Sequence, residues 1–208
     1  MIEFETLLIF IPIALALNIT PGADMLFCLG QGAKSGPQAG VVAALGIATG
    51  SLIHAVVAGL GLAAFLAAFP LAFEIVRWAG VAYLVYLAVQ TLRSPSDTSA
   101  DEPTRSASLK KIWREGTLVC LLNPKVAIFM LALVPQFVDP TQGSVFVQFL
   151  ILGTILNVGG TLICAFVGIF AGRIGRYLTK NAKAATALQY LSSLIFVGLA
   201  LKLATDRR

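Results

Sequence analysis

Residues 18–24 read Asn18-Ile19-Thr20-Pro21-Gly22-Ala23-Asp24 and lie in the middle of an otherwise apolar stretch from Leu7 to Ala33. About 20 apolar residues are enough to cross a bilayer as a helix, so the whole stretch is long enough to span one. Its centre nevertheless contains an amide, a hydroxyl, a proline, a glycine and a carboxylate. A membrane segment that is polar and broken at its centre indicates a functional site at mid-membrane.

A second interruption of the same kind occurs in the other half of the chain, where Asn123-Pro124-Lys125 interrupts the apolar run from Thr117 to Val138. Proline has no N–H and its ring collides with the helical backbone before it, so a helix must kink or unwind there. Two broken spans at matching places in two halves are typical of transporters whose binding site lies at the membrane midplane.

The composition identifies an integral membrane protein. Of the 208 residues, 58% are hydrophobic and 12% are charged, whereas a soluble domain carries about 25% charged residues. The formal net charge is +5, but the basic residues cluster in short loops between apolar runs, where they specify topology. We therefore expect the lipid bilayer, and no nucleic acid, as a partner of this chain.

Six apolar segments separated by turn and loop signals predict an all-α polytopic membrane protein with six transmembrane helices. The one long connection, residues 93–115, divides this single membrane domain into two halves of three spans, 1–92 and 116–208. The predicted spans are Leu7–Ala33, Val41–Ala68, Leu71–Leu92, Thr117–Val138, Val145–Ala171 and Leu188–Ala204.

The two halves carry similar features at similar places. The first and fourth spans are broken, and the second and fifth each carry a glycine and a polar residue four positions apart, Gly50 with His54 and Gly153 with Asn157. Because each half has three spans, the second half must have the opposite orientation in the membrane. The sequence therefore predicts two inverted three-helix repeats with helices 1 and 4 broken.

The basic residues predict the orientation of the chain. Ten of the fifteen Lys and Arg residues fall in the first, third and fifth connections. The positive-inside rule places such loops in the cytoplasm. Residues 93–115 are therefore predicted to be a cytoplasmic linker, with both termini on the outer side of the membrane.

Asp24 is the one acidic residue well inside any predicted span, and Lys125 is the one basic residue similarly placed. A charge at that depth costs about 2.5–3.5 kcal/mol on insertion scales, so each residue is expected to have a structural or functional role that offsets this cost. Two interpretations remain open. The side chains neutralise each other as a structural pair, or Asp24 faces the ammonium and Lys125 the carboxylate of a zwitterion. Asp24 also suits the uptake and release of a proton during turnover.

Pro21 and Gly22 open the backbone, and the freed carbonyl and amide groups are tolerated only where they line a cavity or find partners. Asn18 and Thr20 supply such partners or contact a ligand. A proline kink held together by these two side chains is the alternative to a binding site. A half-helix that starts near Gly22 directs its positive N-terminus to mid-membrane, where an anionic group is stabilised.

His54, the sole histidine, and Asn157 are candidates for a supporting role around this site, together with Gly50. A histidine beside glycines that let helices approach closely is more often a packed hydrogen bonder than a proton relay. With one histidine, separated cysteines and no carboxylate cluster within the spans, we expect no metal site and no cofactor.

These motifs resemble those of the lysine exporter (LysE/RhtB) family of amino-acid efflux proteins. The resemblance covers essentially the whole chain and rests on residues 18–24, on Lys34-Ser35-Gly36 with the glycine-rich second span, and on Leu122-Asn123-Pro124-Lys125. It implies a bacterial inner-membrane exporter, with periplasmic termini in the orientation above, that moves an amino acid or similar metabolite outward in exchange for protons. The family motifs that are expected to bind or move the substrate fall on Asn18, Thr20, Pro21, Gly22, Asp24, Asn123, Pro124 and Lys125.

The chain departs from the family pattern at Ala23, where a second proline is usual, which leaves the detailed backbone geometry open. The spans offer a single acid, so we expect a neutral amino acid as substrate, with an apolar side chain among the options. The rivals are an exporter or channel for an inorganic cation such as cadmium, which needs several converging ligands, and an intramembrane enzyme, which needs a nucleophile beside a base or paired acids. Neither a set of converging ligands nor a nucleophile beside a base or paired acids is evident in the spans. The helix faces of the second and fifth spans that carry glycines suit packing within one bundle and packing across a homodimer equally well.

Overall fold

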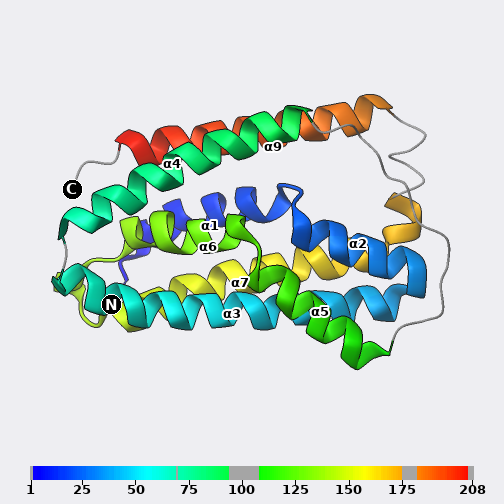
Figure 1. Ribbon diagram of the computed structural model, residues 1–208, viewed down its shortest axis with the longest axis horizontal. Helices are drawn as coiled ribbons and strands as arrows, with labels where there is room; N and C mark the ends of the chain where they lie inside the picture. Colours follow the sequence, from blue (N-terminus) through cyan, green and yellow to red (C-terminus); the bar gives the residue numbers. More distant parts are fainter. Residues whose placement is uncertain (1, 69, 94–107, 175–181, 206–208) are drawn as a thin grey trace.

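Every regular element in the described part of the chain is a helix, in agreement with the predicted all-α class. The computed structural model describes residues 2–68, 70–93, 108–174 and 182–205. Its elements, labelled as in Figure 1, are α1 (Phe4–Ile19), α2 (Ala23–Ser35), α3 (Pro37–Ala68), α4 (Pro70–Arg93), α5 (Leu109–Leu121), α6 (Pro124–Ile128), the π-helix η1 (Phe129–Leu133), the 3-10 helices η2 (Val134–Phe137) and η3 (Pro140–Gln142), α7 (Val145–Ile169) and α9 (Ala182–Thr205).

Two helices are long and apolar enough to cross a membrane by themselves, α3 over Pro37–Gly61 and α7 over Val145–Ile169, with 25 residues each. At 1.5 Å per residue this is about 38 Å, more than the roughly 30 Å hydrocarbon core of a bilayer. Two bent pairs, α1 with α2 and α5 with the segment Pro124–Phe137, meet the same criteria when each pair is taken as one span. Within the described residues there are therefore up to four spans, and they lie at the first, second, fourth and fifth predicted positions.

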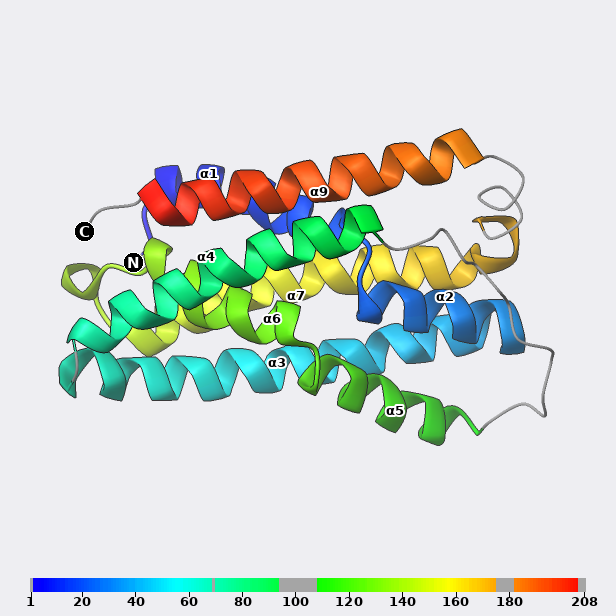
Figure 2. The same ribbon diagram turned by 45° about the horizontal axis from the view of Figure 1, so that its top comes forward.

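Helices α4 and α9 stand at the positions of the third and sixth predicted spans. They pack side by side along one flank of the bundle (Figures 1 and 2), and the Ser193 hydroxyl on α9 donates a 3.1 Å hydrogen bond to the Ala88 carbonyl on α4. The start of α1 and the end of α9 lie at the same end of the bundle, opposite the turn between α2 and α3 (Figure 1). Both ends of the described chain therefore emerge on one side.

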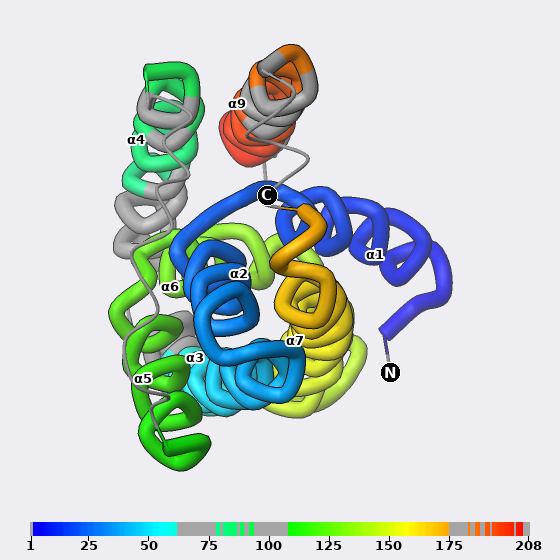
Figure 3. The backbone as a smooth tube through the Cα atoms, turned by 90° about the vertical axis from the view of Figure 1, so that its right-hand side faces the viewer, coloured from blue at the N-terminus to red at the C-terminus, as the bar shows by residue number. Residues whose placement is uncertain are grey.

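Glycines bring the central helices into close contact. A Cβ built on Gly50 of α3 would lie 2.7 Å from Cys120 Cβ of α5, and one built on Gly153 of α7 would lie 2.7 Å from Ala55 Cβ of α3. Small residues at such crossings let the backbones approach and gain van der Waals contact. These glycine faces are therefore used within the bundle, in which α3 packs against both α5 and α7 (Figure 3).

Both predicted interruptions are present. Helix α1 ends at Ile19 and α2 begins at Ala23, with a bend of 51°, while α5 ends at Leu121 and α6 begins at Pro124, with a bend of 50°. Gly22, the N-cap of α2, is fully extended at φ −160° and ψ −175°. Any residue can adopt that conformation, so the backbone freedom of glycine is not required at Gly22. What glycine provides there is the absence of a side chain.

The chain is irregular beyond the second break. The short helix α6 continues as the π-helix η1 and then as the 3-10 helix η2. A π-helix is rare and occurs mainly as a single turn at functional sites. The fourth span is therefore a regular helix before the break, in α5, and irregular after it.

Helix α5 begins earlier than the predicted fourth span. The Ser108 hydroxyl accepts a 3.3 Å hydrogen bond from the Lys111 N–H and caps the helix, which starts at Leu109. Residues 109–115 of the predicted linker are therefore helical, while residues 94–107 of that linker lie outside the described residues. The capping serine is the local signal for this start.

Candidate functional site

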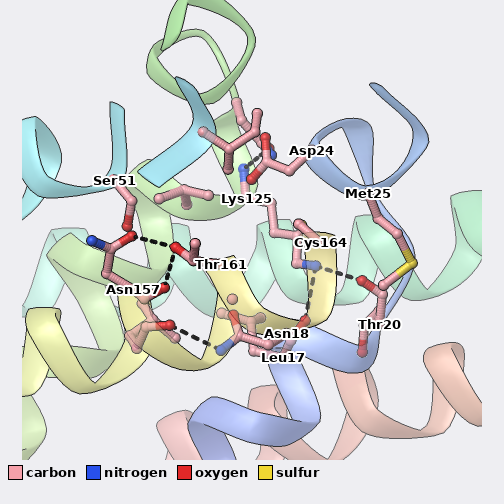
Figure 4. Close-up of a pocket in the computed structure, with 16 residues that line it drawn as sticks. Leu17, Asn18, Thr20, Asp24, Met25, Ser51, Lys125, Asn157, Thr161 and Cys164 are labelled. Atoms are coloured by element: carbon pink, nitrogen blue, oxygen red, sulfur yellow. Dashed lines mark hydrogen bonds between the residues drawn. The ribbon is translucent and has the colours of Figure 1, made fainter. Parts of the chain in front are cut away.

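A polar cavity lies between the two breaks, where α1, α2, α3, α6 and α7 meet (Figure 4). Its volume is about 50 Å³, room for a few water molecules at roughly 10–15 Å³ each. Small-molecule pockets usually measure about 300–1,000 Å³, so side chains or half-helices must move before an amino acid fits. The lining residues are Leu17, Asn18, Thr20, Gly22, Asp24, Met25, Ile47, Ser51, Asn123, Lys125, Val126, Leu156, Asn157, Gly160, Thr161 and Cys164.

The structure brings most of the residues chosen from the sequence to this one cavity. Those that line it are Asn18, Thr20, Gly22, Asp24, Asn123, Lys125 and Asn157. Those that do not are Pro21, Pro124, Gly50 and His54. The two prolines instead shape the backbone on which the lining residues stand.

The ammonium group of Lys125 connects the two broken spans. It donates hydrogen bonds to the carbonyl oxygens of Leu17 at 3.0 Å and Thr20 at 2.8 Å, and it lies 5.7 Å from the centre of the Phe196 ring on α9. Its side chain lies against Gly22, where an added Cβ would be 3.5 Å from Lys125 Cδ and Nζ. The C-terminal end of a helix is partially negative, so the end of α1 stabilises this cation.

Proline creates one of these acceptors. In a regular helix the Leu17 carbonyl would accept from the N–H four residues later, but that residue is Pro21, which has none. The Thr20 carbonyl lies at the C-cap of α1, and the Thr20 hydroxyl turns back to donate to the Ala16 carbonyl at 2.8 Å. The first motif thus leaves two carbonyls free inside the membrane domain, and Lys125 of the second motif satisfies them.

Asp24 lies in the first turn of α2, where the helix N-terminus stabilises a negative charge. It forms no direct ion pair with Lys125 in this structure, and its Oδ1 is buried without a hydrogen-bond partner among the described residues. The structural pair considered from the sequence is therefore not formed here. A buried oxygen without a partner calls for an explanation, and a bound proton or ligand is one.

Asn123 of the second motif lies near the Asp24 carboxyl group. Its Oδ1 accepts a 3.0 Å hydrogen bond from the Lys125 N–H and so caps α6. Its Nδ2 is buried and has no hydrogen-bond partner in the described part of the chain. The cap therefore orients Asn123 and leaves an amide donor in the cavity wall.

Asn18 fastens the end of α1 to α7. Its Nδ2 donates a 3.0 Å hydrogen bond to the Leu156 carbonyl. Gly159 and Gly160 make room for it, since a Cβ on either would lie 3.0 Å from the Asn18 side chain. Asn18 therefore fixes the position of the free carbonyls at the end of α1.

Two lining hydroxyls were not predicted from the sequence. Thr161 on α7 donates a 2.7 Å hydrogen bond to the Asn157 carbonyl and lies 3.4 Å from Asn157 Oδ1. Its position four residues after Asn157 puts it on the same helix face, a signal that helical spacing contains. Ser51 on α3 directly follows Gly50 and offered no comparable signal, because single serines are common in membrane helices.

His54 lies outside the cavity lining, beside the second break. Its Nε2 donates a 3.2 Å hydrogen bond to the Cys120 carbonyl, which joins α3 to the end of α5. Cys28, Cys120 and Cys164 are buried and free. Residues 2–68, 70–93, 108–174 and 182–205 contain no group of three or more His, Cys, Asp or Glu side chains arranged to hold a metal ion.

A sequence profile of the LysE type translocators matches residues 15–207. A homoserine/homoserine lactone efflux protein of Salmonella typhimurium is 30% identical over 204 residues, which cover 98% of each chain. The uncharacterized membrane protein YrhP of Bacillus subtilis is 31% identical over 207 residues, 95% of this chain and 98% of that one. An uncharacterized membrane protein of Vibrio cholerae is 30% identical over 206 residues, 99% of each chain. No solved structure matches this chain.

These matches extend over both broken helices and the helices packed around them. The names of these relatives describe membrane proteins and, for the Salmonella relative, efflux. The resemblance drawn from the two motifs is thus confirmed over the whole chain. This membrane protein belongs to the LysE type translocator family.

Proposed function

We propose that this protein is a secondary transporter that exports a neutral amino acid, or a related small metabolite, across the bacterial inner membrane in exchange for protons. One observation carries the proposal. Both broken helices open onto one cavity, and the charged residues that line it are one acid and one base, Asp24 and Lys125. Free carbonyls and helix ends at such a place are expected where a substrate binds.

The cavity favours a small zwitterion with a polar side chain. Its one acid and one base balance each other's charge, which suits a substrate without net charge, and neutral polar groups line the same cavity. Ser51, Asn157 and Thr161 are grouped away from Thr20 in the close-up (Figure 4). Homoserine, for which the Salmonella relative is named, is a neutral amino acid with a hydroxyl on its side chain. We therefore place homoserine first among the substrates to be tested.

Asp24 is the residue that we propose carries the coupling proton. Other ionisable groups near it are Lys125 on α6, His54 on α3, and the thiols of Cys28, Cys120 and Cys164 on α2, α5 and α7. An ionised Asp24 offsets positive charge in the cavity and so favours a bound ammonium group. Protonation from the periplasmic side removes that charge and promotes release of the substrate, which is the order that antiport requires.

The six-span architecture with two inverted repeats is part of the proposal. Helix α3 packs against α7, and α4 packs against α9, so the second and third predicted spans of one half pair with their counterparts in the other. The two breaks also meet each other and bend by similar angles, 51° and 50°. Equivalent elements that pair around a central site are what inverted repeats produce.

We propose that the N- and C-termini are periplasmic and that residues 93–115 are cytoplasmic. The basic residues of the first, third and fifth connections support this orientation. The common position of the start of α1 and the end of α9 supports termini on one side (Figure 1).

The direct test is efflux from cells that do or do not produce the protein. Cells preloaded with labelled homoserine, threonine, leucine or lysine are diluted into medium without substrate, with and without an ionophore that collapses the proton gradient. We expect faster loss of a neutral amino acid, and the ionophore should abolish the difference. A gain in cadmium tolerance without any change in amino-acid efflux would overturn the proposal in favour of cation export.

A further inference from the structure

The end of α1 holds an ammonium group in a complete binding site, and that ammonium belongs to the protein itself. Lys125 Nζ contacts the Leu17 carbonyl at 3.0 Å, the Thr20 carbonyl at 2.8 Å and the Phe196 ring at 5.7 Å from its centre. Leu17, Thr20 and Phe196 are only 3%, 1% and 1% exposed. Carbonyl oxygens accept the donors of an ammonium group, and an aromatic face within about 6 Å attracts its charge.

Nothing in this set of partners is specific to lysine. The acceptors are backbone carbonyls that the break at Pro21 sets free, and Phe196 presents only a ring. The α-ammonium of an amino acid carries the same charge and three N–H donors, so it can make the same contacts. A substrate ammonium and Lys125 cannot occupy the site together.

The Lys125 side chain is able to move its ammonium group away from the Leu17 and Thr20 carbonyls. Its ammonium stands on a flexible four-carbon stem, and Gly22 beside that stem has no side chain to hold it. Asp24 lines the same cavity, and its Oδ1 has no hydrogen-bond partner among the described residues. An alternative partner for the displaced cation is therefore already in place.

We propose that the Leu17 and Thr20 carbonyls and the Phe196 ring form an ammonium subsite, which Lys125 occupies without substrate and which an amino substrate takes over by displacing Lys125 towards Asp24. This inference rests on the proposed export function and names the place where the amino group of the substrate binds. Charge stays balanced, because Lys125 and Asp24 neutralise each other while the zwitterion is bound.

The exchange gives proton antiport a physical basis. An ionised Asp24 accepts Lys125 and frees the subsite for substrate. A protonated Asp24 no longer holds Lys125, which returns to the carbonyls and expels the substrate. The small cavity volume fits the same account, because the Lys125 side chain occupies the space between the two breaks. Substrates must then carry a free ammonium group.

The first experiment measures ammonium binding without transport. The full-length protein is purified in detergent with Lys125→Ala, which removes the equivalent of a propylammonium ion, and thermal unfolding is followed with added n-propylammonium chloride. A ligand that binds the folded state raises the midpoint. We expect propylammonium to raise the midpoint of Lys125→Ala much more than that of wild type, because in wild type it must first displace Lys125 from the subsite. Tetramethylammonium, which has no N–H donor, and propanol, which has no charge, should have no effect.

Lys110→Ala is the matched control, because Lys110 is exposed on the first turn of α5 and does not line the cavity. It should respond like wild type. Adding Phe196→Leu to Lys125→Ala removes the ring and should weaken the propylammonium effect. An equal response of wild type and Lys125→Ala, or no difference between propylammonium and tetramethylammonium, would overturn the subsite.

The second experiment uses substrate and covers the case in which Lys125→Ala fails to fold. Lys125→Gln keeps a hydrogen-bond donor, on a side chain that is one atom shorter, but loses the charge. We expect this variant to bind L-homoserine about tenfold more tightly than wild type in calorimetry, because no internal ammonium competes with the ligand. Binding of 4-hydroxybutyrate, the analogue without the amino group, should not improve. Equal gains for both compounds would show that Lys125 does not compete for an ammonium subsite.

These measurements separate the subsite from the export function. An ammonium-specific response of Lys125→Ala, together with no amino-acid export by the wild-type protein, would contradict the proposed function and leave the subsite standing. Proton-dependent efflux together with no ammonium-specific response would contradict the subsite alone.

Discussion

The ammonium nitrogen of Lys125 lies 2.8 Å from the carbonyl oxygen of Thr20, a residue 105 positions earlier in the chain. The hydrogen bond joins the two broken helices, since Thr20 caps the end of α1 and Lys125 stands in the first turn of α6. One motif supplies the free acceptors and the other supplies the donor. The two interruptions are thus complementary parts of one site.

Replacing Asp24 with Asn should abolish gradient-driven efflux and leave folding intact. Asn keeps the size and the hydrogen-bonding groups of the side chain but cannot carry a proton. We expect efflux driven by a pH gradient in proteoliposomes to fall to the level of protein-free vesicles. Exchange of internal for external labelled substrate without a gradient should survive, which would separate coupling from binding.

Glu115→Gln is the control for Asp24→Asn. Glu115 pairs with Lys111 at 3.8 Å on the surface, where such pairs contribute at most about 1 kcal/mol. It should leave gradient-driven efflux unchanged. Proton-dependent efflux at the wild-type rate by Asp24→Asn would remove this carboxylate from the coupling mechanism.

Asn123 combines a structural and a proposed binding role, and two substitutions separate them. Asn123→Ala removes the cap of α6 and should destabilise the protein by about 1 kcal/mol. Asn123→Ser restores an acceptor for the Lys125 N–H but lacks the amide donor. We expect Ser to recover the thermal midpoint but not the efflux rate. Equal recovery of both would reduce Asn123 to a helix cap.

Much of this fold is predictable because it follows from local chemistry. Pro21 and Pro124 remove helical hydrogen bonds wherever they stand, so the positions of the two breaks follow from the sequence. The apolar runs likewise give the helices of the second and fifth spans to within a few residues. The start of α5 at Leu109 was missed, because hydropathy locates apolar residues and not the polar first turns of a helix.

The partners within the site are less predictable, because they depend on three-dimensional contacts. The sequence drew attention to opposite charges and suggested that Asp24 and Lys125 pair or share a zwitterion. Lys125 instead binds the carbonyls of Leu17 and Thr20. Every residue carries a carbonyl, so no residue type marks these two acceptors. The missing N–H of Pro21 identifies Leu17 once the position of Lys125 is known.

Close packing at Gly50 provides a stability test with a control on the same helix. A Cβ at Gly50 would lie 2.7 Å from Cys120 Cβ and 2.8 Å from the Thr117 carbonyl, whereas one at Gly61 meets nothing within 4 Å. Gly50→Ala should therefore destabilise the protein by about 1–3 kcal/mol through overpacking. Gly61→Ala should be neutral or stabilising by up to about 1 kcal/mol, because alanine is the better helix former. Thermal unfolding in detergent compares the two, and equal midpoints would contradict the packing of α3 on α5.

The proposed orientation can be tested with single introduced cysteines. The native cysteines are buried, so the unmodified protein serves as a background control. A membrane-impermeant maleimide should label Gln142→Cys in intact cells and label Lys34→Cys only after the cells are opened. The opposite pattern would place the termini and η3 in the cytoplasm.

Pro21→Ala tests whether the break itself is required. Alanine supplies an N–H four residues after Leu17, which then competes with Lys125 for the Leu17 carbonyl and favours a continuous helix from α1 into α2. We expect efflux to fall strongly while thermal stability is kept or increased, because a regular helical hydrogen bond replaces an open turn. Pro12→Ala is the matched control, since Pro12 lies inside α1 and does not line the cavity. It should also favour a regular α1 but leave efflux unchanged. Wild-type efflux by Pro21→Ala would mean that the free Leu17 carbonyl is not needed, and the site would then have to be built from side chains alone.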